Sequence, residues 1–220
     1  MMKPLPSGPW EALFPRAVLL IDEIERYGGA SDPFWTLGGG TVLMFRYGHR
    51  VSKDIDIFVP DPQYLGYVTP RLSDTAASLT EDYTEMPSSF VKLQFEEGEI
   101  DFVAAPNLTD GAWEPWVIQG RAVRVETAAE VVAKKMFHRG DRATARDLFD
   151  LAMVIEREPD ALAAAAPFLM RHRDRFLQQI SQPGAGFVAS FEAIAATGYE
   201  PRLEHCVEVA TAYLSALGHP

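Results

Sequence analysis

Hydrophobic residues recur at helical spacing between residues 10 and 27, where Leu13, Leu20 and Ile24 fall on one helical face. Gly28 and Gly29 follow directly, and glycine commonly ends a helix because it adopts left-handed backbone angles freely. The pattern therefore predicts an opening helix over residues 10–27.

Shorter patterns follow and predict, in order, a strand, a glycine turn, a helix and a second strand, at residues 34–37, 38–40, 41–47 and 54–59. A further helical stretch ends near Leu79. Alternating apolar and polar residues then predict three strands and a small β element, at residues 83–86, 90–95, 99–103 and 113–125. The chain up to residue 126 thus has the pattern of a mixed sheet with helices.

Helical periodicity with many alanines runs from Thr127 to the end of the chain. Thr127 and Glu130 have the spacing of a capping box, in which each side chain accepts a hydrogen bond from the other residue's backbone. Prolines divide this region into about five helices, at Pro159, Pro167, Pro183 and Pro201. We therefore expect two domains, an α/β core over residues 1–126 and a helical domain over residues 127–220.

The composition is that of a globular protein: 220 residues, 47% of them hydrophobic, are enough to bury one large core or two smaller ones. A single cysteine, Cys206, excludes an internal disulfide. No stretch has the roughly 20 apolar residues of a membrane span. We expect a cytoplasmic protein that has no membrane contact.

The net charge of −11 argues against binding nucleic acid through a generally basic surface. One basic island interrupts the acidic chain, at Lys134, Lys135, Arg139, Arg142 and Arg146. This island is the clearest candidate for a surface that faces an anion.

Two carboxylates give the clearest chemical signal. Asp54 and Asp56 stand two residues apart in the second predicted strand, so their side chains point to the same face. Mg²⁺ prefers oxygen ligands, usually one or two carboxylates together with the phosphates of a bound nucleotide. The pair therefore indicates a metal site and phosphoryl or nucleotidyl chemistry.

A third carboxylate, Asp101, lies on the face of its predicted strand opposite Ile100 and Phe102. If this strand neighbours the strand of Asp56, Asp101 joins the metal site. Three carboxylates can hold two metal ions, of which one binds the triphosphate and the other lowers the pKa of the attacking hydroxyl. The alternative is that Asp101 balances a surface lysine such as Lys92.

The glycine turn Gly38, Gly39 and Gly40 joins a predicted strand to a predicted helix. Its bare backbone allows a phosphate to approach while the first helical N–H groups point at it. A purely structural turn is the alternative. Asp54 and Asp56 on the next strand favour the phosphate site.

The sequence resembles a known family at two places. Gly-Gly-Gly-Thr at residues 38–41, followed by Arg-x-Ser-x-Asp-x-Asp at residues 50–56, is similar to the nucleotidyltransferase superfamily and most of all to its AbiEii/AbiGii toxin-like branch. A lysine-bearing helix at residues 130–135, followed by Arg-Asp-Leu-x-Asp-Leu at residues 146–151, resembles the second signature of that branch. The resemblance implies an α+β fold with a polymerase-β-like mixed sheet, flanking helices and a C-terminal helical domain.

The resemblance also implies roles for single residues. Asp54 and Asp56 are expected to bind Mg²⁺ or Mn²⁺, Lys135 to bind the triphosphate, and Asp147 to act as a further acid. Gly39 and Thr41 are expected to line the phosphate site.

Other roles stay open at this point. Arg50 and Ser52 match the family spacing: Ser52 is a candidate phosphate contact, and Arg50 a candidate partner of a carboxylate or the nucleotide, with a role in the turn as the alternative. Lys134 and Lys135 lie 100° apart on a helix, so only one faces the site. On the following helix, Asp147 lies at the edge of the apolar stripe and Asp150 nearly opposite it, which favours Asp147 as the functional acid.

The resemblance implies an enzyme that transfers a nucleoside monophosphate from a nucleoside triphosphate (NTP) to a hydroxyl of RNA, such as tRNA, or of a protein. A small, aminoglycoside-like acceptor is one alternative. The other is a non-catalytic module that binds a nucleotide or a cognate antitoxin.

Overall fold

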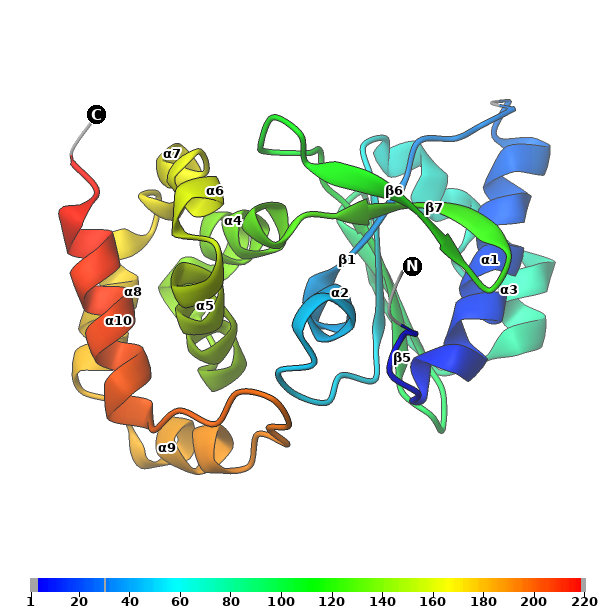
Figure 1. Cartoon of the computed structure of the whole chain (residues 1–220). Coiled ribbons are helices and arrows are strands. Elements are labelled where there is room, and N and C mark those ends of the chain that lie inside the picture. The colour runs from blue at the N-terminus through cyan, green and yellow to red at the C-terminus, as the bar shows by residue number, and fades with distance from the viewer. Residues whose placement is uncertain (1–3, 30, 219–220) are drawn as a thin grey trace. The chain divides into compact units, whose positions relative to one another are not determined.

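The computed structural model describes residues 4–29 and 31–218 (Figure 1). The chain divides into two compact units. Unit 1 consists of three segments, Met1–Phe45, Ser52–Asn107 and Trp113–Val125. Unit 2 consists of Arg46–Val51, Leu108–Ala112 and Glu126–Pro220. The two domains predicted from the sequence, with a boundary after residue 126, stay a prediction.

A seven-stranded mixed sheet forms the centre of unit 1, with the strand order β3-β4-β5-β2-β1-β7-β6. Its strands are β1 Thr36–Gly38, β2 Ile55–Val59, β3 Tyr83–Met86, β4 Phe90–Gln94, β5 Glu99–Ala104, β6 Trp113–Ile118 and β7 Arg121–Glu126. β2 pairs with β5, and β1 with β7, in parallel, whereas β1–β2, β3–β4 and β4–β5 are antiparallel. The mixed sheet with flanking helices confirms the α+β class that the sequence predicts.

The helices of unit 1 are α1 Trp10–Tyr27, α2 Gly39–Tyr47 and α3 Asp74–Leu79, with the 3₁₀ helix η1 Pro62–Tyr67. The apolar face of α1, with Leu13, Leu20 and Ile24, is buried, as its periodicity predicts. α1 packs against α3, η1 and strands β2 and β5, and α1 and α3 are seen side by side in Figure 1. α1 thus covers the face of the sheet that is opposite Asp56 and Asp101.

The predicted order of strand, helix and strand is confirmed in β1, α2 and β2. The glycine turn predicted at residues 38–40 is not a separate segment, because Gly38 ends β1 and Gly39 and Gly40 begin α2. At the predicted hairpin, β4 and β5 pair in antiparallel fashion across Glu97 and Gly98. β6 and β7 are neighbours in the sheet, joined by Gln119 and Gly120, which both have positive φ angles. A two-residue turn of this kind matches the twist of a hairpin.

Unit 2 is helical in its main segment. Its helices are α4 Ala128–Arg139, η2 Gly140–Arg142, α5 Ala145–Arg157, α6 Pro159–Ala163, α7 Ala166–Leu169, α8 Arg173–Ser181, α9 Ala185–Glu192 and α10 Leu203–Ala216. α10 packs along α5 (Figure 1). No helix in the described part of the chain has both the length and the apolar character needed to span a bilayer.

The expectation of about five helices was wrong, because proline is not the only residue that ends a helix here. Seven α-helices lie within the described residues of this region. One additional break separates α4 from α5, where Thr144 starts a new helix with its own cap. Another separates α7 from α8 at residues 170–172.

The predicted cap of α4 is only half of a capping box. The Thr127 side chain accepts a hydrogen bond from the Glu130 N–H. The Glu130 carboxylate, however, accepts from the N–H groups of Leu108 and Thr109, each at 2.9 Å. It therefore anchors a loop instead of closing the box on Thr127.

Candidate active site

Four neighbouring strands align two of the predicted acidic residues, Asp56 and Asp101, in one row. Asp101 of β5 pairs in register with Asp56 of β2. On either side, Asp101 faces Lys92 of β4, and Asp56 faces Gly38 of β1. Residues opposite one another in neighbouring strands share a face of the sheet. The row therefore leads from Lys92 through two carboxylates to the start of the glycine turn.

The alternation predicted from the sequence is present on both acidic strands. Ile55 and Ile57 of β2 are fully buried, as are Ile100 and Phe102 of β5. Their neighbours on the row face, including Asp56, are only partly buried. The condition attached to Asp101, that its strand neighbours the strand of Asp56, is met.

Gly39 brings the glycine turn against the carboxylate of Asp56. Its φ angle is +70°, in the left-handed region that favours glycine. A Cβ at this position would lie 1.8 Å from Asp56 Oδ2 and 2.4 Å from its Cγ. Only a residue without a side chain fits, so the Asp56 carboxylate lies directly beside the N-terminus of α2. Helix N-termini attract anions such as phosphate.

Asp54 is turned toward the neighbouring hairpin. Its Oδ1 accepts a hydrogen bond of 3.0 Å from the Glu99 N–H. Its backbone carbonyl accepts a hydrogen bond of 2.5 Å from the hydroxyl of Thr41, which is fully buried. Thr41 thus ties α2 to the start of β2 and holds Asp54 in place.

One of the two carboxylate oxygens of Asp101 has no hydrogen-bond partner within the described residues. Oδ2 lies 3.2 Å from Lys92 Nζ, whereas Oδ1 is buried and has no hydrogen-bond partner among the described residues. Burial and the nearby charge of Asp56 raise the pKa of Asp101 to about 7, although Lys92 acts in the opposite direction. Carboxylates held together in this way favour a cation between them.

The residues present fit a divalent metal in part. Asp56 and Asp101 supply two adjacent carboxylates, and one oxygen is buried and unsatisfied. Mg²⁺ commonly takes one or two carboxylates and completes its shell with phosphates and water. Within the described residues, no three acidic, histidine or cysteine side chains already form a ligand set. The predicted set of Asp54, Asp56 and Asp101 stays a prediction.

A second cluster of charges lies in unit 2 and separates the two adjacent lysines. Lys135 Nζ lies 2.8 Å from Asp147 Oδ1 and 2.8 Å from Asp150 Oδ2. Lys134 is buried elsewhere in the unit, and its Nζ lies 2.5 Å from Glu126 Oε1 and 3.4 Å from Glu130 Oε1. Lys135 is thus the lysine that joins Asp147, as the family pattern suggests.

Asp147 closes a complete capping box at the start of α5. Its Oδ2 accepts hydrogen bonds of 2.9 Å from both the N–H and the hydroxyl of Thr144. Its Oδ1 pairs with Lys135 and with Arg139, the latter at 2.6 Å. Burial alone would raise the pKa of Asp147, but these two cations outweigh it and hold the pKa below its usual range.

Asp150 is the site residue that sequence reasoning missed. It is completely buried and accepts hydrogen bonds from Arg50 Nε and Nη2 at 2.7 and 2.8 Å and from Lys135 Nζ at 2.8 Å. His49 Nε2 lies 2.8 Å from its Oδ1. Burial opposes ionisation, but the charges of Lys135 and Arg50 hold the pKa of Asp150 well below its ordinary value.

Asp150 lies nearly opposite the apolar stripe, as its spacing predicts, but this side of α5 is buried too, because α5 packs against α4, α6, α9 and α10. The signal available in the sequence was the second acid of Arg-Asp-Leu-x-Asp-Leu, at residues 146–151.

Two further predicted residues have structural contacts of their own. Arg50 pairs with a carboxylate, that of Asp150, which was one of its two predicted roles. The backbone N–H of Ser52 donates to Met44 Sδ at 3.2 Å. The phosphate contact predicted for the Ser52 hydroxyl stays a prediction.

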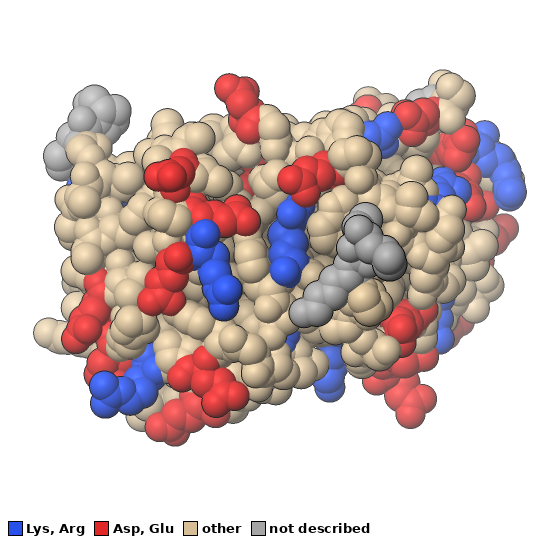
Figure 2. Space-filling view, in the orientation of Figure 1, with Lys and Arg blue, Asp and Glu red and all other residues tan. Residues whose placement is uncertain are grey.

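The basic island is smaller than its sequence suggests. Lys134 and Lys135 are withdrawn into ion pairs, and Arg139 pairs with Asp147. Arg142 and Arg146 are exposed. On the face shown in Figure 2, basic and acidic side chains are interspersed.

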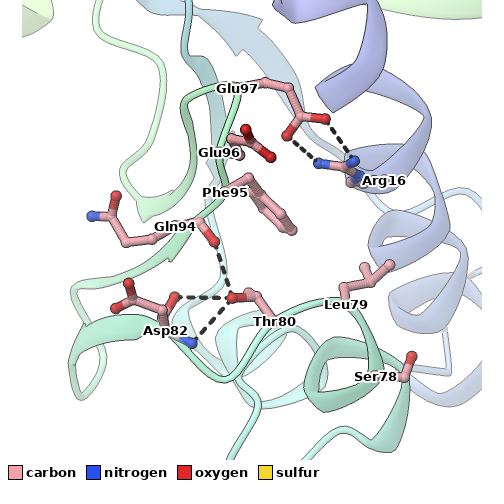
Figure 3. Close-up of a pocket in the computed structure, with 9 residues that line it drawn as sticks. All are labelled: Arg16, Ser78, Leu79, Thr80, Asp82, Gln94, Phe95, Glu96 and Glu97. Atoms are coloured by element: carbon pink, nitrogen blue, oxygen red, sulfur yellow. Dashed lines mark hydrogen bonds and ion pairs between the residues drawn. The ribbon is translucent and has the colours of Figure 1, made fainter.

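A separate hollow in unit 1 has a volume of about 650 Å³ (Figure 3). It lies between α1, the end of α3 and the β4–β5 hairpin. Two of its charged side chains pair with each other: Arg16 bonds twice to Glu97, at 2.8 and 2.9 Å, and lies over the ring of Phe95. It contains none of the predicted site residues.

Solved structures of similar fold come from two Helicobacter pylori proteins. One, assigned as a candidate nucleotidyltransferase, has 16% identity and a TM-score of 0.55, with 96% of each chain covered. The other, JHP933, has 16% identity and a TM-score of 0.51, with 96% of this chain and 93% of that chain covered. At such identity the likeness shows a shared fold.

The nucleotidyltransferase toxin MenT4 from Mycobacterium tuberculosis has 16% identity and a TM-score of 0.49, with 92% of this chain and 85% of that chain covered. None of the curated protein sequences compared with this chain matches it. The family model for the nucleotidyl transferase AbiEii toxin of type IV toxin–antitoxin systems matches residues 27–217, which is most of the chain. The protein therefore belongs to the AbiEii nucleotidyltransferase toxin family.

Proposed function

We propose that this protein transfers a nucleoside monophosphate from an NTP to a hydroxyl acceptor in a reaction that requires Mg²⁺ or Mn²⁺. The observation that carries the proposal is the carboxylate of Asp56, held in register with Asp101 and directly against Gly39. A metal-binding pair and a phosphate-binding helix terminus thus meet at one residue.

Asp56 and Asp101 would hold the metal, with Asp54 as the third predicted ligand. When bound, the metal offsets the negative charge of the triphosphate and lowers the pKa of the attacking hydroxyl. Gly38, Gly39 and the N-terminus of α2 bind phosphate through backbone N–H groups.

The reaction forms a bond between the acceptor oxygen and the α-phosphorus and breaks the bond to the leaving pyrophosphate. Asp101 is suited to help activate the acceptor hydroxyl, directly or through the metal that it would hold, because its Oδ1 is buried and has no hydrogen-bond partner among the described residues. In the family assignment, Lys135 binds the triphosphate, and Asp147 holds the ammonium group of Lys135 in position. Arg50 contributes through Asp150, which binds both cations.

The acceptor that we propose is RNA, such as tRNA, or a protein side chain. The toxin family implies a cognate antitoxin, and we propose a cytoplasmic location for the protein. An RNA acceptor needs cations, and the exposed Arg142 and Arg146 remain available in the basic island. Small-molecule acceptors and binding without turnover are the alternatives that the following experiment distinguishes.

The purified protein is incubated with each α-³²P-labelled NTP, Mg²⁺ or Mn²⁺, and total cellular RNA, and RNA and protein are then separated on gels. We expect a labelled RNA or protein band whose intensity falls at least about a hundredfold in Asp56→Asn, because a metal ligand is lost. Asp110→Asn, which changes an exposed acid, serves as the matched control and should label normally. Equal labelling by Asp56→Asn would contradict the proposal. Unlabelled macromolecules with intact nucleotide binding would favour a small acceptor or a binding module.

A further inference from the structure

Lys92 is the residue at the end of the acidic row that the proposed reaction does not use. It lies on β4, opposite Asp101 in the register of the β4–β5 pair. Its ammonium group pairs with Glu99 Oε2 and lies 3.2 Å from Asp101 Oδ2. Lys92 thus brings a positive charge directly to one carboxylate of the proposed metal site.

The two oxygens of the Asp101 carboxylate have different surroundings. Lys92 is bound to Oδ2 of Asp101, while Oδ1 is buried and unsatisfied. Asp56 and Asp101 would therefore hold a metal close to the ammonium group of Lys92. Two cations at that separation repel each other noticeably, because the site is only partly exposed to water.

Glu99 offsets this repulsion. It lies two residues before Asp101 on the same face of β5, and its carboxylate pairs with Lys92. The Lys92 and Glu99 side chains are 32% and 31% exposed, so both have freedom to adjust. The same Glu99 donates its backbone N–H to Asp54. Lys92 therefore keeps a partner even if the metal takes over Asp101.

From this arrangement we infer that the Lys92–Glu99 ion pair sets the divalent-metal affinity of the Asp56–Asp101 site. Lys92 satisfies Asp101 in the metal-free protein and opposes metal binding, and Glu99 limits that opposition by retaining Lys92. This inference rests on the metal site of the proposed function. It assigns Lys92 and Glu99 as positioning residues that control the charge at the site.

We expect opposite effects from the two neutral substitutions. Lys92→Gln removes a competing positive charge and should tighten Mn²⁺ binding by about three- to tenfold, the range expected for a single charge at a partly exposed site. Glu99→Gln leaves Lys92 with Asp101 alone and should weaken binding by a similar factor. The double variant should bind almost like the original protein, and Lys92→Arg, which keeps the charge, should do the same.

The probe is Mn²⁺ alone, added to the nucleotide-free full chain, with free Mn²⁺ measured by electron paramagnetic resonance. The titration is done at pH 8.5, where Asp101 is largely ionised. Arg26→Gln removes a positive charge from α1, where the arginine pairs with Glu23, and serves as the matched control for net charge. Asp56→Asn shows how much of the binding belongs to this site.

Opposite shifts in Lys92→Gln and Glu99→Gln, with unchanged binding in Arg26→Gln, would support the inference. Unchanged or weaker binding in Lys92→Gln, while Asp56→Asn still loses the ion, would overturn it and leave the metal site of the proposed function in place. If the unsubstituted protein and Asp56→Asn bind Mn²⁺ equally or not at all, the metal site itself fails, and this inference fails with it.

Discussion

At the scale of single residues, the Asp56 carboxylate leaves no room for a side chain at Gly39. The left-handed backbone and the 1.8 Å that would separate a Cβ from Oδ2 of Asp56 are two separate reasons for glycine. The first concerns stability, since a non-glycine residue at positive φ is strained. The second concerns the proposed function, because the carboxylate would have to move away from the N-terminus of α2, where we propose that phosphate binds.

These two reasons are separable by substitution. Gly39→Ala should destabilise the protein by more than about 1 kcal/mol and abolish labelling from the NTP, because Asp56 is displaced. Gly111→Ala is the matched control, since Gly111 has φ +66° but open space around its Cβ position. Urea unfolding and the labelling assay measure both effects. If Gly39→Ala labels as well as Gly111→Ala, the close approach to Asp56 has no functional role.

The sequence predicts which carboxylates are candidates better than it predicts their contacts. The alternation of Asp56 with the buried Ile55 and Ile57 is predicted correctly, since alternation in a strand is a local property. Asp54 instead lies just before β2 and is turned toward the β4–β5 hairpin. That Asp101 lies beside Asp56 was only a condition, because strand order depends on residues far apart in the chain. The contacts of Lys92 and Glu99 also depend on the pairing of β4 with β5, so local sequence patterns could not predict them.

At the scale of elements, α5 carries two acids into the interior of unit 2. Its neighbours α4, α6, α9 and α10 cover the apolar positions, and cations from α4 and the segment before β2 neutralise Asp147 and Asp150. Helical periodicity placed Asp150 opposite the apolar stripe, which is correct as geometry. It could not show that this side of the helix is covered as well.

The buried charges of α5 should make Asp150 important for stability. Asp150→Asn removes the charge that offsets Arg50 and Lys135, so we expect the free energy of unfolding to fall by about 3–5 kcal/mol. Asp160→Asn, an exposed acid at the start of α6, is the matched control and should change it by less than about 0.5 kcal/mol. Urea unfolding at neutral pH gives both values. A loss in Asp150→Asn no larger than that of the control would contradict this role of the cluster.

The same substitution should also change the response to acid. The folded-state pKa of Asp150 lies well below its unfolded value, so its contribution is fully present above about pH 4 and is lost as the pH falls further. The unsubstituted protein should therefore lose stability below pH 4 more steeply than Asp150→Asn. Parallel curves in this range would contradict a folded-state pKa of Asp150 that is lower than its unfolded value.

At the scale of the whole molecule, the motif resemblance covers residues 37–151, whereas the family model extends over residues 27–217. The helices after α5 therefore belong to the family's architecture although they carry no motif. The number of helices expected in residues 127–220 was too small because the breaks at η2 and after α7 occur without proline. The acidic net charge of −11, read from composition, still limits how an RNA acceptor can bind.

The proposed function depends above all on a metal held by Asp56 and Asp101 at the nucleotidyl-transfer site. Anomalous diffraction from crystals of the full chain, grown with Mn²⁺ and a non-hydrolysable NTP analogue, locates that metal directly. We expect an anomalous peak within about 2.5 Å of carboxylate oxygens of both Asp56 and Asp101, with the triphosphate at the N-terminus of α2. A bound triphosphate whose Mn²⁺ contacts neither carboxylate would refute the proposed site.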